Sequence, residues 1–109
     1  MKPRTLKRTV EIRAINGWRH KLDRNGEGES WMVTDEYRIE HANGSIGVAL
    51  SAQEAFGRVL AADNKLAHRK RKEPIIIITT INWHDILPGM KVPSSESKVV
   101  SSYGKDGKS

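Results

Sequence analysis

The side chains that could do chemistry in this sequence are its lysines and arginines, which are grouped in three stretches of the chain. If residues 51–72 form one helix, four of these cations fall within a narrow stripe of it. The stripe holds Arg58, Lys65, Arg69 and Lys72, spaced by 7, 4 and 3 residues. Nucleic-acid phosphates attract such cations whatever the base sequence. With roughly six phosphate contacts, the logarithm of the binding constant falls with the logarithm of the salt concentration at a slope of about −5.

The sequence therefore predicts a small, non-catalytic module that binds nucleic acid mainly through its phosphates. An N-terminal arm and a β-hairpin are expected to add cations to those of the helix, so that all of them share one surface. The residues expected to bind are Arg4, Lys7, Arg8, Arg13, Arg19, Lys21, Arg24, Arg58, Lys65, Arg69, Lys70, Arg71 and Lys72. DNA is favoured over RNA, because a two-stranded ribbon fits the major groove.

The net charge of +6 is unevenly distributed along the 109 residues. Residues 1–24 carry eight basic and two acidic side chains, and residues 65–72 carry five basic and no acidic ones. The segment between them carries two basic and seven acidic side chains. Such segregation is an argument about binding partners, although a basic run can also serve only to keep a small protein soluble.

A protein partner is the alternative hypothesis. The acidic middle and the basic ends would give a dipolar surface able to clamp an enzyme of opposite charge pattern, as small inhibitors and adaptors from phages and plasmids do. The isoleucine-rich segment at residues 75–78 could also pair across a homodimer if it lies at a sheet edge. The aromatic Trp18, Trp31 and Tyr37 could stack on unpaired bases, but six aromatic residues are too few for an evident stacking platform, and the alternative is that Trp18 and Trp31 are core residues.

Catalysis has weaker support. Glu96 and Lys98 have the Glu-x-Lys spacing of metal-dependent nucleases, and Asp85 precedes them by eleven residues. These residues fall in or near a serine-rich stretch that we expect to be poorly ordered, so no enzyme activity is predicted. The four histidines show no ligand spacing and no phosphate-binding glycine loop is present, so neither a metal nor a cofactor is expected.

The length and the apolar content suit a single domain. There are no cysteines, which excludes disulfides and thiolate chemistry. The longest apolar run is four isoleucines, far below the roughly 20 residues that a membrane span needs. The basic N-terminus lacks the apolar core of a signal peptide, so we expect a cytoplasmic protein with no membrane partner.

The first half of the chain reads as strands and turns. Residues 1–8 are expected to be a flexible basic arm, followed by a hairpin over residues 9–22 that turns at Asn16-Gly17. Residues 23–30 form either a tight turn or a mobile loop. A third strand follows over 31–41 with a bulge or break at Asp35-Glu36, and an Asn43-Gly44 turn leads to a fourth strand at 45–50.

The second half begins with a helix capped by Ser51 and Glu54. Its apolar face contains Asp63, which means either that the helix stops near Asp63-Asn64 or that Asp63 is buried against a partner; the first is favoured. The β-branched run from residue 75 is expected to be a central strand buried on both faces. Residues 93–109 read as a weakly ordered tail with a possible short strand at 98–103.

The predicted fold is therefore α+β. It has an antiparallel sheet of about four to five strands in the order ββ–ββ–α–β, with one helix packed on one face. The domain is expected to span residues 9–92.

Overall fold

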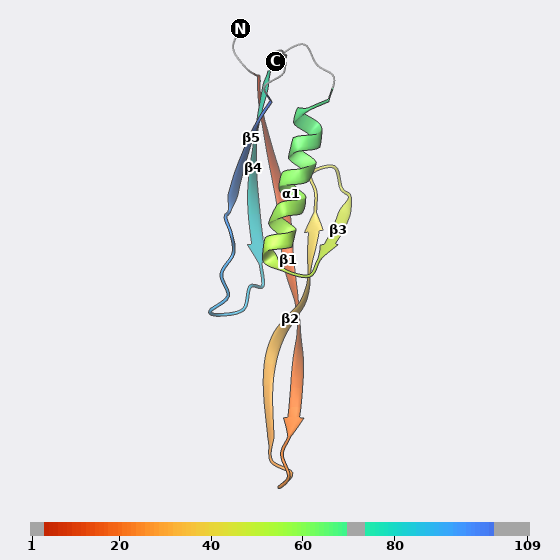
Figure 1. Cartoon of the computed structure of the whole chain (residues 1–109), viewed down its shortest axis with the longest axis vertical. Coiled ribbons are helices and arrows are strands. Elements are labelled where there is room, and N and C mark those ends of the chain that lie inside the picture. Colours follow the sequence, from red (N-terminus) through yellow and green to blue (C-terminus); the bar gives the residue numbers. More distant parts are fainter. Residues whose placement is uncertain (1–3, 70–73, 102–109) are drawn as a thin grey trace.

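A computed structural model describes residues 4–69 and 74–101 of the chain. They form one five-stranded sheet with a single helix on one face (Figure 1). The elements are β1 (Arg4–Leu22), β2 (Gly28–Glu40), β3 (Ile46–Ala49), α1 (Ala52–Ala67), β4 (Ile75–His84) and β5 (Glu96–Val100). The strand order is β3-β2-β1-β4-β5, which puts β1 in the middle of the sheet.

The sheet is mixed, which confirms the α+β class with one helix and corrects the antiparallel arrangement. The pairs β1–β2, β2–β3 and β4–β5 are antiparallel, but β1 and β4 are parallel, with Leu6 opposite Ile77. The chain leaves the sheet at β3, passes through α1 and re-enters on the far side of β1. A connection through a helix is what allows two strands to run in the same direction.

Residues 4–22 form one long strand, so the predicted hairpin turn at Asn16-Gly17 is wrong. Asn16 pairs with Thr34 and Gly17 with Val33 across the β1–β2 ladder. The expected irregularity in β2 is confirmed as a β-bulge: Ile15 pairs with Glu36 and Asn16 with Thr34, so the intervening Asp35 has no opposite residue in the ladder.

The turn lies at residues 23–27 instead. The Asp23 carboxylate accepts hydrogen bonds from the amides of Asn25 and Glu27, at 2.8 and 2.9 Å. Gly26 adopts φ 79°, a left-handed conformation that favours glycine. The second Asn-Gly of the sequence is therefore the hairpin turn, and the tight-turn interpretation of residues 23–30 is the correct one.

This late turn gives the molecule a projecting arm, which we define as residues 16–34. The body of the domain lies at one end and the arm extends from it as a two-stranded ribbon (Figure 1). The molecule measures 71 × 24 × 22 Å in consequence.

The core lies between α1 and the sheet. Ser51 caps the helix by accepting from the Glu54 amide at 3.0 Å, as predicted, but the Glu54 carboxylate accepts from Leu50 and not from Ser51. Fully buried apolar side chains gather in two clusters beneath the helix. The first includes Val10, Ile12, Ile39, Ala55, Val59 and Ile81, and the second Ala67, Ile75, Ile77 and Val99.

The isoleucine run of β4 is covered on one face only. Ile75 and Ile77 are buried beneath α1, whereas Ile76 and Ile78 on the opposite face are only partly buried. The expectation of burial on both faces is wrong, because the sole described helix covers one side of the sheet. The central strand is β1, and β4 lies next to it.

Both ends of the domain extend further than expected. Residues 4–8, predicted as part of a flexible arm, belong to β1 and pair with β4, while residues 1–3 lie outside the described part of the chain. The possible short strand in the tail is β5, which pairs with Ile76–Thr80 of β4.

Replacing a buried isoleucine should be far more damaging than replacing an exposed one. We expect Ile77→Ala to lower the free energy of unfolding by about 2–5 kcal/mol, because it leaves a cavity under α1. Ile46→Ala, at a side chain that is 69% exposed, should change it by less than about 0.5 kcal/mol. Urea denaturation followed by circular dichroism measures both, and similar losses in the two variants would contradict this core assignment.

Candidate functional site

The structure decides the question that the sequence left open at Asp63. The helix continues through this residue to Ala67, so the expectation that it stops near Asp63-Asn64 is wrong. Asn64 does not end the helix: its carbonyl still accepts from the His68 amide at 3.0 Å, and its side-chain amide donates to the Leu60 carbonyl at 3.1 Å. Asp63 is fully buried in the apolar face, which was the second of the two alternatives.

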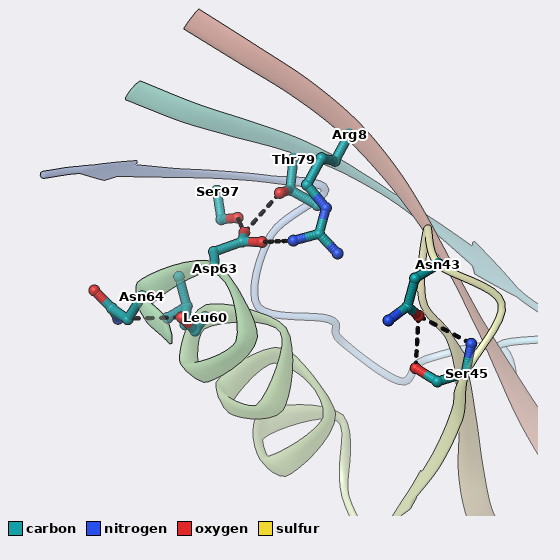
Figure 2. Close-up of polar contacts among 8 residues, drawn as sticks. All are labelled: Arg8, Asn43, Ser45, Leu60, Asp63, Asn64, Thr79 and Ser97. Carbon is teal, nitrogen blue, oxygen red and sulfur yellow. Dashed lines mark hydrogen bonds and ion pairs between the residues drawn. The ribbon is translucent and has the colours of Figure 1, made fainter. Parts of the chain in front are cut away.

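Every oxygen of the buried Asp63 carboxylate has a partner (Figure 2). Arg8 of β1 forms an ion pair with Oδ1 at 2.9 Å. Thr79 of β4 and Ser97 of β5 donate their hydroxyl protons to Oδ2, at 2.6 and 3.3 Å. A buried charge is tolerated only with such partners, so this one residue links the helix to three strands.

The ion pair holds Arg8 at the edge of a groove of about 600 Å³. The groove lies between the second half of α1 and the turn that joins β2 to β3. Its polar and charged lining residues are Arg8, His41, Asn43, Ser45, Lys65 and Arg69, and Leu6, Ala42, Ala62 and Leu66 supply its apolar wall. Three cations and no carboxylate therefore line it, which makes the groove suited to an anion.

The β2–β3 turn forms one wall of the groove and confirms the predicted Asn43-Gly44 turn. The Asn43 side-chain oxygen accepts from both the amide and the hydroxyl of Ser45, at 3.0 and 2.7 Å (Figure 2). Gly44 adopts φ 88°, and its amide donates to the His41 carbonyl at 2.9 Å. These local bonds fix the position of His41 at the start of the turn.

His41 has a buried polar atom that lacks a hydrogen-bond partner in the structure as described, its Nδ1. Burial lowers the pKa of His41 below its ordinary value, and the nearby positive charge of Arg8 lowers this pKa further. The negative charge of Asp63 acts in the opposite direction but is outweighed. The imidazole is therefore neutral at pH 7.

Cations from two of the three predicted groups, the N-terminal segment and the helix end, lie close together. The start of β1 and the end of α1 lie at the same end of the molecule (Figure 1). Arg8, Lys65 and Arg69 share the groove, and Arg4 is exposed on the same strand, where its amide donates to the Pro74 carbonyl. We call Arg4, Arg8, Lys65 and Arg69 the basic end. Lys70, Arg71 and Lys72 follow Arg69 in sequence and lie outside the described residues.

The remaining predicted residues do not join this group. Arg13 and Arg58 form exposed ion pairs with Asp85 and Glu54, at 2.7 and 3.0 Å. Lys7 alternates with the groove-lining Leu6 and Arg8, so it belongs to the other face of the sheet.

The hairpin cations lie furthest away. Arg19 is ion-paired with Asp35, Lys21 stands opposite Glu29 in the ladder, and Arg24 lies in the turn at the tip of the arm. They are at the opposite end of the long axis from the basic end (Figure 1). The hairpin therefore does not share one surface with the helix end.

Sequence reasoning missed three polar residues of the groove. His41, Asn43 and Ser45 showed no ligand spacing, and only the Asn-Gly turn signal marked this region. Asp63 was recognisable as a charge in an apolar face, but its partners are 16–55 residues away in sequence, which no local pattern reveals.

The nuclease-like spacing does not produce a cluster of acidic groups. Glu96 and Lys98 lie on the ordered strand β5, not in the loose stretch that was expected. Glu96 pairs with Thr80, whereas Asp85 follows the far end of β4 and is ion-paired with Arg13. Within residues 4–69 and 74–101, no group of three His, Asp or Glu side chains could hold a metal ion.

Comparison with protein-family models, with curated proteins and with solved structures finds no match for this chain. Among the helices of the described residues, none has the length and apolar character needed to cross a membrane.

Removing the buried carboxylate should be costly. Asp63→Ala leaves the partly buried guanidinium of Arg8 and two buried hydroxyls without their acceptor, so we expect a loss of about 3–5 kcal/mol in the free energy of unfolding. Glu36→Ala, which breaks an exposed pair with Arg38, should cost at most about 1 kcal/mol. Urea denaturation of the two variants tests this, and equal losses would show that the Asp63 network contributes little.

Stability should decrease on acidification because of His41. Since its pKa is lower in the folded chain, the unfolded chain takes up the proton first as the pH falls below the ordinary value of 6.5. The facing charges are Arg8 of β1, Asp63 and Lys65 of α1, and Arg69, which follows the end of α1. We expect His41→Gln to lose less unfolding free energy than the parent between about pH 7.5 and about pH 5.5. An identical loss in both proteins would contradict this assignment.

Proposed function

We propose that this protein is a small, non-catalytic module that binds nucleic-acid phosphates at its basic end. The observation that carries the proposal is the meeting of Arg8, Lys65 and Arg69 in one groove, although Arg8 lies 57 residues before Lys65 in the sequence. Cations brought together in a groove attract a phosphate backbone more strongly than the same cations dispersed over a surface.

Asp63 offsets the charge of Arg8, so the net positive charge of the groove comes from Lys65 and Arg69, for which no ion pair is described. Asp63 is the acidic residue closest to Arg8, and its oxygens are already bound by Arg8, Thr79 and Ser97 inside the protein. Arg8 uses Nη1 for this pair, which leaves the rest of its guanidinium to face the groove. An arginine held rigidly in this way binds a phosphate oxygen with little further loss of side-chain freedom.

The rest of the surface is less suited to phosphates. Four of the exposed arginines there are paired with acidic groups, namely Arg13, Arg19, Arg38 and Arg58. The same pairing weakens the alternative of an inhibitor acting through a dipolar surface, because the acidic middle of the sequence is largely offset by neighbouring arginines. Since the arm is not a basic ribbon, the reason for favouring DNA over RNA is lost, and the proposal covers both.

Matched pairs of charge removals test where nucleic acid binds. We expect Lys65→Ala/Arg69→Ala to weaken binding to any sequence and to reduce the log–log salt slope by roughly 2 on duplexes, because two phosphate contacts are lost. Lys21→Ala/Arg24→Ala changes the net charge equally at the other end and should leave both quantities nearly unchanged. Fluorescence anisotropy with single- and double-stranded DNA and RNA oligonucleotides at several salt concentrations measures this.

Two outcomes would overturn the proposal. If the parent protein binds none of these oligonucleotides at low salt, the basic end has another role. If the two double variants weaken binding equally, the protein responds to net charge alone and the groove is not the site.

A further inference from the structure

The arm carries a row of exposed apolar side chains on one of its two faces. Trp18 and Leu22 are 58% and 72% exposed and lie on the same face, because they are four residues apart on one strand. Met32 stands opposite Trp18 in the ladder, so it shares this face, and it is 38% exposed. We call Trp18, Leu22 and Met32 the apolar row.

The strands of the arm are paired only with each other over the described residues. The β1–β4 ladder ends at Arg13, and the β2–β3 ladder begins at Tyr37. Residues 16–22 and 28–34 therefore each have one open edge of unpaired backbone amides and carbonyls. A two-stranded ribbon is marginally stable in water by itself, so an arm of this length gains stability when another surface covers it.

The charge of the arm helps to identify the surface that covers it. Residues 18–32 contain three basic and three acidic side chains, so this part of the arm is neutral and the remaining chain carries the whole net charge of +6. Nucleic acid gains little from a neutral ribbon. Another copy of the same neutral ribbon meets it without repulsion, provided that the two positively charged bodies stay apart.

We propose that the arm is a dimerisation element whose occupant is the arm of a second copy of this chain. The two apolar rows face each other, and the arms run antiparallel about a two-fold axis that passes near the cross-strand pair of His20 and Ser30. Such an axis places Trp18 of each copy beside Leu22 of the other, because these residues are equally spaced from His20.

The antiparallel arrangement follows from the charge distribution. In a parallel pair the two bodies would lie side by side with their basic ends close together, and like charges would oppose association. In an antiparallel pair the bodies lie at opposite ends of the joined arms. The inference does not depend on the proposed function, since the arm and the basic end are at opposite ends of the molecule (Figure 1).

Two tryptophans on opposite faces of the arm allow a matched test. Trp31 stands opposite Arg19 and lies on the face away from the apolar row. We expect the parent and Trp31→Ala to sediment as dimers between about 1 μM and about 1 mM, and Trp18→Ala to dissociate with a dimer constant weakened by about tenfold or more. A monomeric parent over this range, or an equal effect of both variants, would overturn the proposal.

Cross-linking tests the position of the axis, because the chain has no cysteine of its own. His20→Cys puts two thiols near each other across the proposed axis, so mild oxidation should give a covalent dimer. Lys91→Cys, at an exposed position on the body, is the control and should stay monomeric under the same oxidant. Cross-linking of the control to the same extent, or none at His20→Cys in a dimeric sample, would show that the arms do not meet in this way.

A short oligonucleotide separates this inference from the proposed function. Trp18→Ala should bind an oligonucleotide that spans a single basic end as tightly as the parent does, while losing its dimer. Failure of nucleic-acid binding together with an intact dimer would overturn the proposed function alone.

Discussion

The buried carboxylate of Asp63 is the constraint on which the arrangement of this domain depends. A charge in the apolar face of a helix has to be matched inside the protein, and Arg8, Thr79 and Ser97 supply that match from three different strands. The same contact that satisfies the core also fixes Arg8 at the rim of the groove. The Arg8–Asp63 ion pair therefore both stabilises the fold and positions a residue of the candidate site.

Local patterns in the sequence predicted the helix and most of the strand-forming segments, but not all of the turns and connections between them. Alternation correctly put Trp18 and Leu22 on one face of a strand, and the cap at Ser51 began the helix. Three Asn-Gly pairs gave the same turn signal, yet only two of them are turns. At Asn16-Gly17 the ladder between β1 and β2 outweighs local preference, because the strand continues to pair with Met32–Thr34.

The candidate site was predictable only in part, for a related reason. Charge runs showed that cations are abundant, but whether a cation is available depends on partners distant in sequence. Arg13 is neutralised by Asp85, 72 residues later, whereas Lys65 and Arg69 reach the groove without a described ion pair. Of the predicted cations, the structure brings Arg4, Arg8, Lys65 and Arg69 to one end of the molecule. The hairpin cations lie apart from them because the turn is further along the chain than expected.

The parallel pairing of β1 with β4 has a consequence for how the chain folds. Arg4 meets Ile75 only after 71 further residues have been made, although β1 and β2 can join early as neighbours in sequence. Until β4 pairs with it, the central strand β1 keeps an unpaired edge, and the isoleucine-rich β4 is not yet part of the sheet. The interval between these two events is when strands of different nascent or refolding chains compete for the same edge, so aggregation during slow refolding should originate there.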